Sequence, residues 1–130
     1  FGLERYFARW EFAVRHLLCA SDVEAWRLDD LLALADDETA RLWNDLRLGY
    51  TESTGHPVLR AEIATLYESV GPEDVLVFAG AEDAIFCLSN VLLGPGDHAV
   101  VTWPGYQSLY EVGRAAGADV TLHELREADG

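Results

Sequence analysis

Two short turns carry the residue types that best suit ligand chemistry. Gly80, Ala81 and Glu82 directly follow an apolar run at residues 75–79, and Tyr106 ends a turn that follows a second apolar run at residues 99–103. A helix beginning at Gly80 has unpaired N–H groups and the positive end of its dipole, which suit an anion such as a phosphate. Taken alone, however, the first turn is more typical of an ordinary strand-to-helix connection with acidic residues at the helix start.

The elements around these turns alternate in a regular order. Apolar runs at 75–79, 99–103 and 120–122 are separated by two helix-period segments, which end at Gly94 and Gly117. Strand, helix, strand, helix, strand with short connections predicts an α/β layer on a largely parallel sheet. In such sheets ligands bind beyond the carboxyl ends of the strands, which is where both turns lie.

The upstream half is predicted to be mainly helical. Residues 1–14 carry an apolar stripe at helical spacing, and residues 16–20 form either a strand or the end of that helix. Ser21 and Glu24 fit a helix-capping box. Two short helices are expected at 28–35 and 38–48, and a third helix from Pro57, with its apolar stripe reaching Val70.

Four stretches, in this order and spacing, resemble the class I/II aminotransferases, which are pyridoxal-phosphate (PLP) enzymes of the aspartate-aminotransferase fold. They are residues 49–60, with a tyrosine and glycines before Leu-Arg; residues 79–85; residues 93–97; and residues 103–106. The resemblance covers roughly residues 20–125. It implies a three-layer α-β-α large domain, present in part, preceded by an amino-terminal helical segment.

The resemblance also implies roles for individual residues. The backbone of Gly80, Ala81 and Glu82 would cradle the PLP phosphate, with the Glu82 and Asp83 carboxylates turned away to avoid repulsion. Tyr106 would stack on the PLP ring. Tyr50 would reach the phosphate of a neighbouring subunit. For these tyrosines the alternatives are a core aromatic and a half-buried loop residue.

The substrate side of the site is implied by the same resemblance. Ala20 and Ser21 would form a small-residue turn whose N–H groups meet the substrate carboxylate. The substrates would be a small-molecule amino acid and a 2-oxo acid, handled in a biosynthetic homodimer. The implied division is an arm and small-domain segment at 1–56, followed by the first part of the PLP-binding domain at 57–130.

The chain contains no lysine, because all nine basic residues are arginines. A PLP enzyme needs one lysine to hold the cofactor as a Schiff base and to move the proton. The family places that lysine downstream of the last residue here. The chain is therefore interpreted as an amino-terminal piece that cannot catalyse transamination alone.

Composition narrows the remaining possibilities. The net charge of −14 argues against nucleic-acid and anionic-membrane partners, and no apolar run approaches transmembrane length. Cys19 and Cys87 are interpreted as buried free thiols of a reducing cytoplasm. The four histidines share no metal-ligand spacing, so no metal site is predicted.

The sequence leaves three hypotheses of function open. The first is an aminotransferase, with other enzymes of the same PLP fold (lyases, decarboxylases, cyclases) as close variants. The second is a Rossmann-like nucleotide-binding module, although the Gly-x-Gly-x-x-Gly pattern is absent. The third is a non-enzymatic interaction protein, which the missing lysine favours.

Two structural expectations distinguish the aminotransferase hypothesis from the Rossmann-like hypothesis. Successive strands usually neighbour one another, which would pair residues 75–79 with 99–103. The aminotransferase resemblance implies instead that only 99–103 and 120–125 pair, in parallel, and that the gap leaves apolar and backbone groups exposed. It also makes the Trp103–Pro104 bond a candidate cis peptide.

Overall fold

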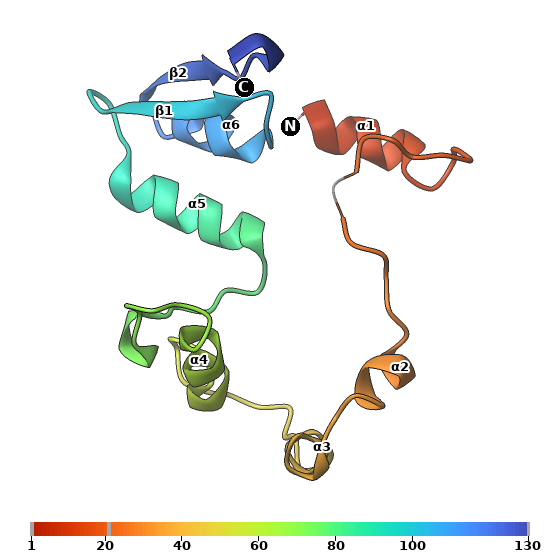
Figure 1. The fold of residues 1–130 in the computed structure, drawn as a ribbon. Helices are drawn as coiled ribbons and strands as arrows, with labels where there is room; N and C mark the ends of the chain where they lie inside the picture. The colour runs from red at the N-terminus through yellow and green to blue at the C-terminus, as the bar shows by residue number, and fades with distance from the viewer. Residues whose placement is uncertain (1, 21, 130) are drawn as a thin grey trace.

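The chain follows a ring of helices that ends in a small α/β unit, beside which the amino-terminal helix lies (Figure 1). The computed structural model describes residues 2–20 and 22–129. Its elements are α1 (Gly2–Trp10), α2 (Leu28–Leu32), α3 (Asp37–Asn44), α4 (Pro57–Ala64), η1 (Pro72–Asp74), α5 (Ala81–Leu92), β1 (His98–Trp103), α6 (Ser108–Ala115), β2 (Asp119–Glu124) and η2 (Glu127–Asp129).

The α/β unit confirms the predicted strand pairing. β1 and β2 run parallel, with His98 opposite Asp119 and Trp103 opposite Glu124. α6 makes the crossover and packs on the strands and on α5. A Cβ on Gly113 would lie 3.2 Å from Leu93 Cδ1, so the absence of a side chain lets α6 approach its neighbours closely.

Residues 75–79 do not form the predicted strand. The segment is extended, but within the described residues its one backbone bond to another segment runs from Val77 N to Thr54 O, at 3.0 Å. A strand requires a ladder of such bonds, which a single contact with a loop does not provide. The expectation that this segment makes no ladder with β1 is confirmed, because the described sheet contains only β1 and β2.

The upstream helices are shorter than the sequence patterns predict. α4 begins with Pro57 at its first position, as expected, but ends at Ala64 instead of continuing to Val70. The Thr65 hydroxyl donates to the Glu62 carbonyl at 2.6 Å, an alternative to helical bonding at this end. No helix begins at the proposed capping box, since residues 22–27 are irregular and the next helix, α2, begins at Leu28. Ser21 itself lies outside the described residues.

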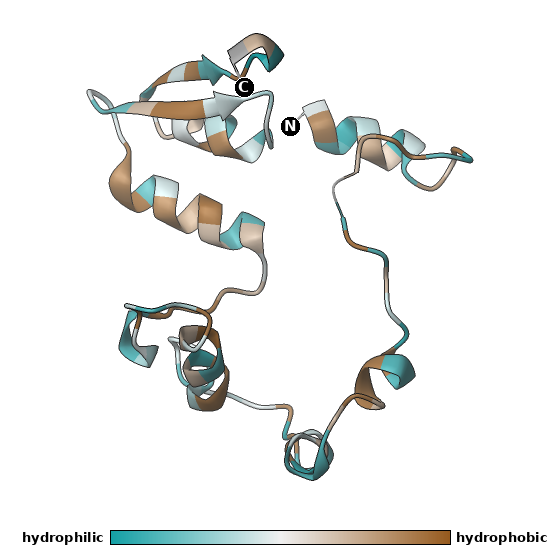
Figure 2. Cartoon of the chain, in the orientation of Figure 1, coloured by the Kyte–Doolittle hydropathy of each residue, from teal (hydrophilic) through white to brown (hydrophobic). Residues whose placement is uncertain are grey.

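Hydrophobic residues are spread along all the helices and both strands (Figure 2), and most of the large apolar side chains are exposed. Among the described residues, the buried hydrophobic side chains are those of Ala64, Val112 and Ala118. A helix that packs on one side alone leaves the apolar residues of its other side in contact with solvent, and Val91 of α5 is an example of such a largely exposed residue. The expected exposure of apolar side chains is found in both predicted strand segments, since Leu76 and Val100 are 55% and 64% exposed.

The cysteines differ from their prediction. Both thiols are free, but Cys19 is exposed and Cys87 is only partly buried. The apolar residues around Cys19 in the sequence do not pack over it, since residues 12–20 form no helix or strand. No helix in the described part of the chain has the length and apolar character needed to cross a membrane.

Candidate cofactor and substrate site

The start of α5 presents open backbone donors. Gly80 is the N-cap, in extended conformation, and a Cβ built on it would meet nothing within 4 Å. Within the described residues, no acceptor pairs with the N–H groups of Ala81, Glu82 or Asp83. These donors, at the positive end of a twelve-residue helix, form a cradle that suits a phosphate.

The two carboxylates next to this cradle have other partners. The Ser108 hydroxyl donates a hydrogen bond to the Glu82 carboxylate, which joins the first turns of α5 and α6. Asp83 Oδ1 lies 3.8 Å from Cys87 Sγ, one turn further along α5. The carboxylate of Glu82 is thus held toward α6 by its bond to Ser108.

Tyr106 lies in the loop between β1 and α6. The preceding Trp103–Pro104 bond is cis, as predicted. A Cβ on Gly105 would lie 2.8 Å from the Thr102 carbonyl oxygen, so the backbone passes close to itself just before the tyrosine. Tyr106 is 43% exposed, which leaves part of its ring accessible to a ligand.

The Tyr106 loop forms one wall of a pocket of about 600 Å³ whose other wall comes from the amino-terminal segment. Its lining residues are Leu3, Glu4, Phe7, Glu11, Cys19, Ala20, Asp22, Pro104, Gly105 and Tyr106. The structure therefore brings the predicted substrate residue Ala20 together with Tyr106. Its neighbour Ser21 lies outside the described residues.

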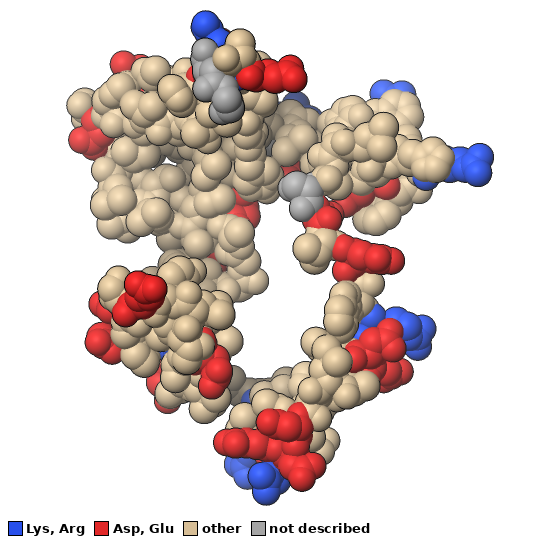
Figure 3. All heavy atoms as spheres, in the orientation of Figure 1, with Lys and Arg blue, Asp and Glu red and all other residues tan. Residues whose placement is uncertain are grey.

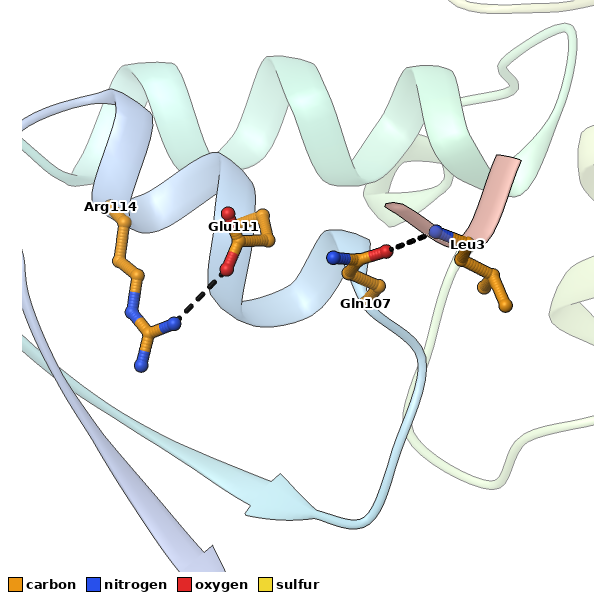
Figure 4. Close-up of polar contacts among 4 residues, drawn as sticks. All are labelled: Leu3, Gln107, Glu111 and Arg114. Atoms are coloured by element: carbon orange, nitrogen blue, oxygen red, sulfur yellow. Dashed lines mark hydrogen bonds and ion pairs between the residues drawn. The ribbon is translucent and has the colours of Figure 1, made fainter. Parts of the chain in front are cut away.

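α1 is fixed to this loop by one polar contact (Figure 4). The Leu3 N–H donates to Gln107 Oε1 at 2.8 Å, across 104 residues of sequence. Within α6, which Gln107 precedes as the N-cap, Arg114 and Glu111 form an ion pair of 3.0 Å that does not involve α1. The Gln107 contact closes the ring and holds the amino-terminal segment beside Tyr106.

The cradle and the other predicted residues lie in different hollows. Glu82 lines a groove between α5 and α6, together with Phe86 and Val112. Tyr50 is fully exposed and lines a pocket of about 1270 Å³ beside α3. In this single chain, Tyr50 is placed neither with Tyr106 nor with the groove of Glu82.

The loop around Tyr50 contains a perturbed carboxyl group. The Thr51 hydroxyl donates to Glu52 Oε2 at 2.7 Å, and this bond is the main reason that the pKa of Glu52 lies below its ordinary value. The nearby side chains of His56 and Arg60 lower the pKa of Glu52 further. Glu52 is therefore a stable negative charge beside Tyr50 at neutral pH.

Gln107 and Ser108 are not among the site residues predicted from the sequence. Both are polar residues at the start of a helix directly after Tyr106, which is the available sequence signal. Their partners, Leu3 and Glu82, lie 104 and 26 residues away. Such long-range pairs cannot be identified from local spacing.

Comparison with known proteins places the chain in a family. Residues 19–130 match the family described as Aminotransferase class I and II. An arginine–pyruvate transaminase of Pseudomonas aeruginosa is 34% identical over 86 residues, which make up 62% of this chain and 22% of that protein. The HTH-type transcriptional regulator TauR of Rhodobacter capsulatus is 31% identical over 99 residues, 76% of this chain and 20% of that protein.

Solved structures agree with these matches. A PLP-dependent aminotransferase from Streptococcus suis superposes with a TM-score of 0.85 and 28% identity, over 99% of this chain and 35% of that one. The PLP-dependent cyclase OrfR gives a TM-score of 0.78 and 29% identity, over 96% and 33%.

The coverage values define how much of the fold is present. The chain spans about one fifth of the length of the curated relatives named above. The fold is that of the fold-type-I PLP enzymes, in part, as the resemblance implied. The chain belongs to the class I and II aminotransferase family.

Proposed function

We propose that this chain forms part of the PLP site of an enzyme that transfers an amino group between an amino acid and a 2-oxo acid. The observation that carries the proposal is the start of α5, where three N–H groups are unpaired within the described residues and Gly80 leaves open space. A dianionic phosphate fits that donor set. Family membership makes PLP the cofactor that brings such a phosphate.

Each candidate residue has a separate role in binding the cofactor or the substrate. Gly80, Ala81 and Glu82 hold the phosphate through their backbone, and Tyr106 stacks on the ring. Ala20 and Ser21 receive the substrate carboxylate. When bound, the cofactor supplies an electron sink for the substrate carbon that carries the amino group.

Tyr50 belongs to the same proposal through a second subunit. Its ring is fully exposed in the single chain and lies apart from Tyr106. A phenol can donate one hydrogen bond to a phosphate across a subunit interface. We therefore propose a homodimer in which Tyr50 of each subunit completes the other subunit's site.

The division at 1–56 and 57–130 follows from these roles. The first part carries Ala20, Ser21 and Tyr50, and the second carries the cradle and Tyr106. Acidic side chains form clusters on the lower half of the visible face (Figure 3), and the net charge is −14. That charge supports small-molecule partners in the cytoplasm over nucleic acid or anionic membranes.

The first test measures PLP affinity in the complete protein by absorbance titration. Ala81→Asp introduces a carboxylate among the free N–H groups and should weaken PLP binding about tenfold or more through repulsion. Val91→Asp is the control, because it adds the same charge at the other end of α5. Equal affinities for PLP and phosphate-free pyridoxal in the unaltered protein would contradict the cradle.

The second test uses the 130-residue chain itself. Because it contains no lysine, treatment with PLP and borohydride should leave no pyridoxyl group on an internal residue. Mass spectrometry of the digested chain checks this, and the complete protein is the comparison. A stable internal adduct in the chain would show that another residue takes the role of the lysine.

A cyclase is a second candidate function. The specific observation is the superposition on a PLP-dependent cyclase over 96% of this chain. Transamination consumes a 2-oxo acid and produces a new amino acid, whereas a cyclase needs no 2-oxo acid. Product analysis with and without a 2-oxo acid distinguishes the two reactions.

A further inference from the structure

Ser108 is the one buried polar side chain in the described part of the chain, with 2% of its surface exposed. It begins α6, two residues after Tyr106. An ionised carboxylate only accepts hydrogen bonds, so the hydroxyl of Ser108 is the donor in its bond with Glu82. A serine has a single O–H, and this bond uses it.

Glu82 is a potential competitor for the cradle. It occupies the second position of α5, and glutamate in the first turn of a helix is attracted to the free N–H groups and the dipole there. A Glu82 side chain that folded back would place a negative charge where a phosphate must sit. In the structure it lies instead in the groove between α5 and α6.

The nearby charges of Glu111 and Arg114 do not compete with the bond between Ser108 and Glu82. Glu111 lines the same groove, but its carboxylate is paired with Arg114 at 3.0 Å. Glu111 therefore has its own cation and does not need the Ser108 hydroxyl. Within the described residues, Ser108 is the one hydrogen-bond partner of the Glu82 side chain.

We propose that Ser108 is a positioning residue that holds the Glu82 carboxylate against α6 and so keeps the α5 cradle open for the phosphate. The proposal rests on the function proposed above. The same bond ties the cradle to the helix that follows Tyr106, so phosphate seat and stacking ring are kept in a fixed relation.

The test compares PLP with pyridoxal, its phosphate-free form, in the complete protein. Ser108→Ala releases Glu82 and should weaken PLP binding about tenfold while leaving pyridoxal binding unchanged. Glu82→Gln in the Ser108→Ala background removes the competing charge and should restore most of the PLP affinity. Ser89→Ala, a partly buried serine in the middle of α5, is the matched control and should have no effect.

A second variant covers the case in which Ser108→Ala unfolds the protein. Glu82→Asp shortens the side chain by one methylene, so the carboxylate cannot keep its bond to Ser108, and the buried site is untouched. It should weaken PLP binding as Ser108→Ala does. Thermal melting of each variant establishes that the fold is intact.

The outcomes separate the two proposals. If Ser108→Ala weakens PLP and pyridoxal equally, or if Glu82→Gln fails to restore PLP binding, Ser108 is merely structural and the inference is wrong. Unchanged PLP affinity in Ser108→Ala and Glu82→Asp also overturns it, while the proposed function stands. Failure of the unaltered protein to bind PLP overturns the proposed function itself.

Discussion

At the scale of single residues, Tyr106 carries the clearest expectation. Its ring is partly exposed beside Ala20, on a loop constrained by Gly105. An aromatic stacked on a flat, electron-poor ring contributes through its face and not through its hydroxyl. The role therefore depends on the presence of a ring at this position.

Substitution of Tyr106 tests that role. Tyr106→Ala should weaken PLP binding by about 1 kcal/mol, roughly fivefold, whereas Tyr106→Phe should leave it nearly unchanged. Fluorescence titration of the complete protein with PLP measures both. Tyr67→Ala removes an exposed ring outside the proposed site and is the control. Equal losses in the alanine and phenylalanine variants would assign the effect to the hydroxyl.

At the scale of elements, a loop holds the segment that leads into α5. Gly55 is buried with φ at +108°, and a Cβ there would lie 2.5 Å from Val77 Cγ2. Arg60 of α4 fixes the same region, since its Nε donates to the Val75 carbonyl at 2.9 Å. The position of the segment that leads into α5 thus depends on contacts from the preceding loop and from α4.

Gly55→Ala should destabilise this connection. The positive φ alone costs about 1–3 kcal/mol for a residue with a side chain, and the contact with Val77 adds to it. Urea denaturation of the complete protein measures the free energy of unfolding. Gly49→Ala is the control, because a Cβ there meets nothing within 4 Å and its φ is not positive. Equal stability of both variants would contradict the packing.

α3 has a pH-dependent cap. Asp36 accepts a hydrogen bond from the Thr39 N–H at 2.8 Å, and this bond and the Thr39 hydroxyl hold the pKa of Asp36 below its ordinary value. A carboxyl group whose pKa is lowered by folding stabilises the folded form fully at pH values above its ordinary, unfolded-state pKa. That contribution is lost as the pH falls through the lowered pKa.

The cap predicts the behaviour of one variant. Asp36→Ala should lower the helix content of α3 at neutral pH, and the difference from the unaltered chain should vanish at low pH. Backbone chemical shifts of residues 37–44 report it. Asp45→Ala, at the carboxyl end of α3, should not reduce helicity. A pH-independent difference would assign the loss to something other than the ionised cap.

At the scale of the whole molecule, the ring shape leaves little room for a core. The space-filling view shows an opening through its centre (Figure 3), and side chains such as Phe12 and Leu18 are more than 90% exposed. Exposed apolar surface on this scale marks surfaces that other protein segments cover. The net charge of −14 opposes self-association of this surface.

These two properties predict how the 130-residue chain behaves on its own. It should bind the dye ANS (8-anilino-1-naphthalenesulfonate) strongly. It should also form larger species as salt is raised, because the screening length falls from about 10 Å at 0.1 M to 3 Å at 1 M. Fluorescence and size-exclusion chromatography measure both effects, with the complete protein as the comparison. A chain that stays monomeric without dye binding would show that its apolar surface is not available.

The sequence by itself determined what local patterns specify. A helix after the small-residue turn at Gly80, the end of α6 before Gly117 and the existence of β1 and β2 follow from periodicity and turn residues, whereas the pairing of β1 with β2 was implied by the resemblance. The resemblance supplied the cis bond and the gap before β1. Among the candidate residues, the small-residue turn at Gly80 and the loop position of Tyr106 were predictable, because neighbouring residues set both.

Only the tertiary structure decided which distant residues meet. It joined Ser108 to Glu82 and Gln107 to Leu3, it placed Ala20 beside Tyr106, and it left residues 75–79 extended without a ladder. Hydrogen bonds and pockets of this kind depend on how separate elements pack. The spacing of residues along a single sequence does not show which distant segments meet in space, such as Leu3 and Gln107, which are 104 residues apart.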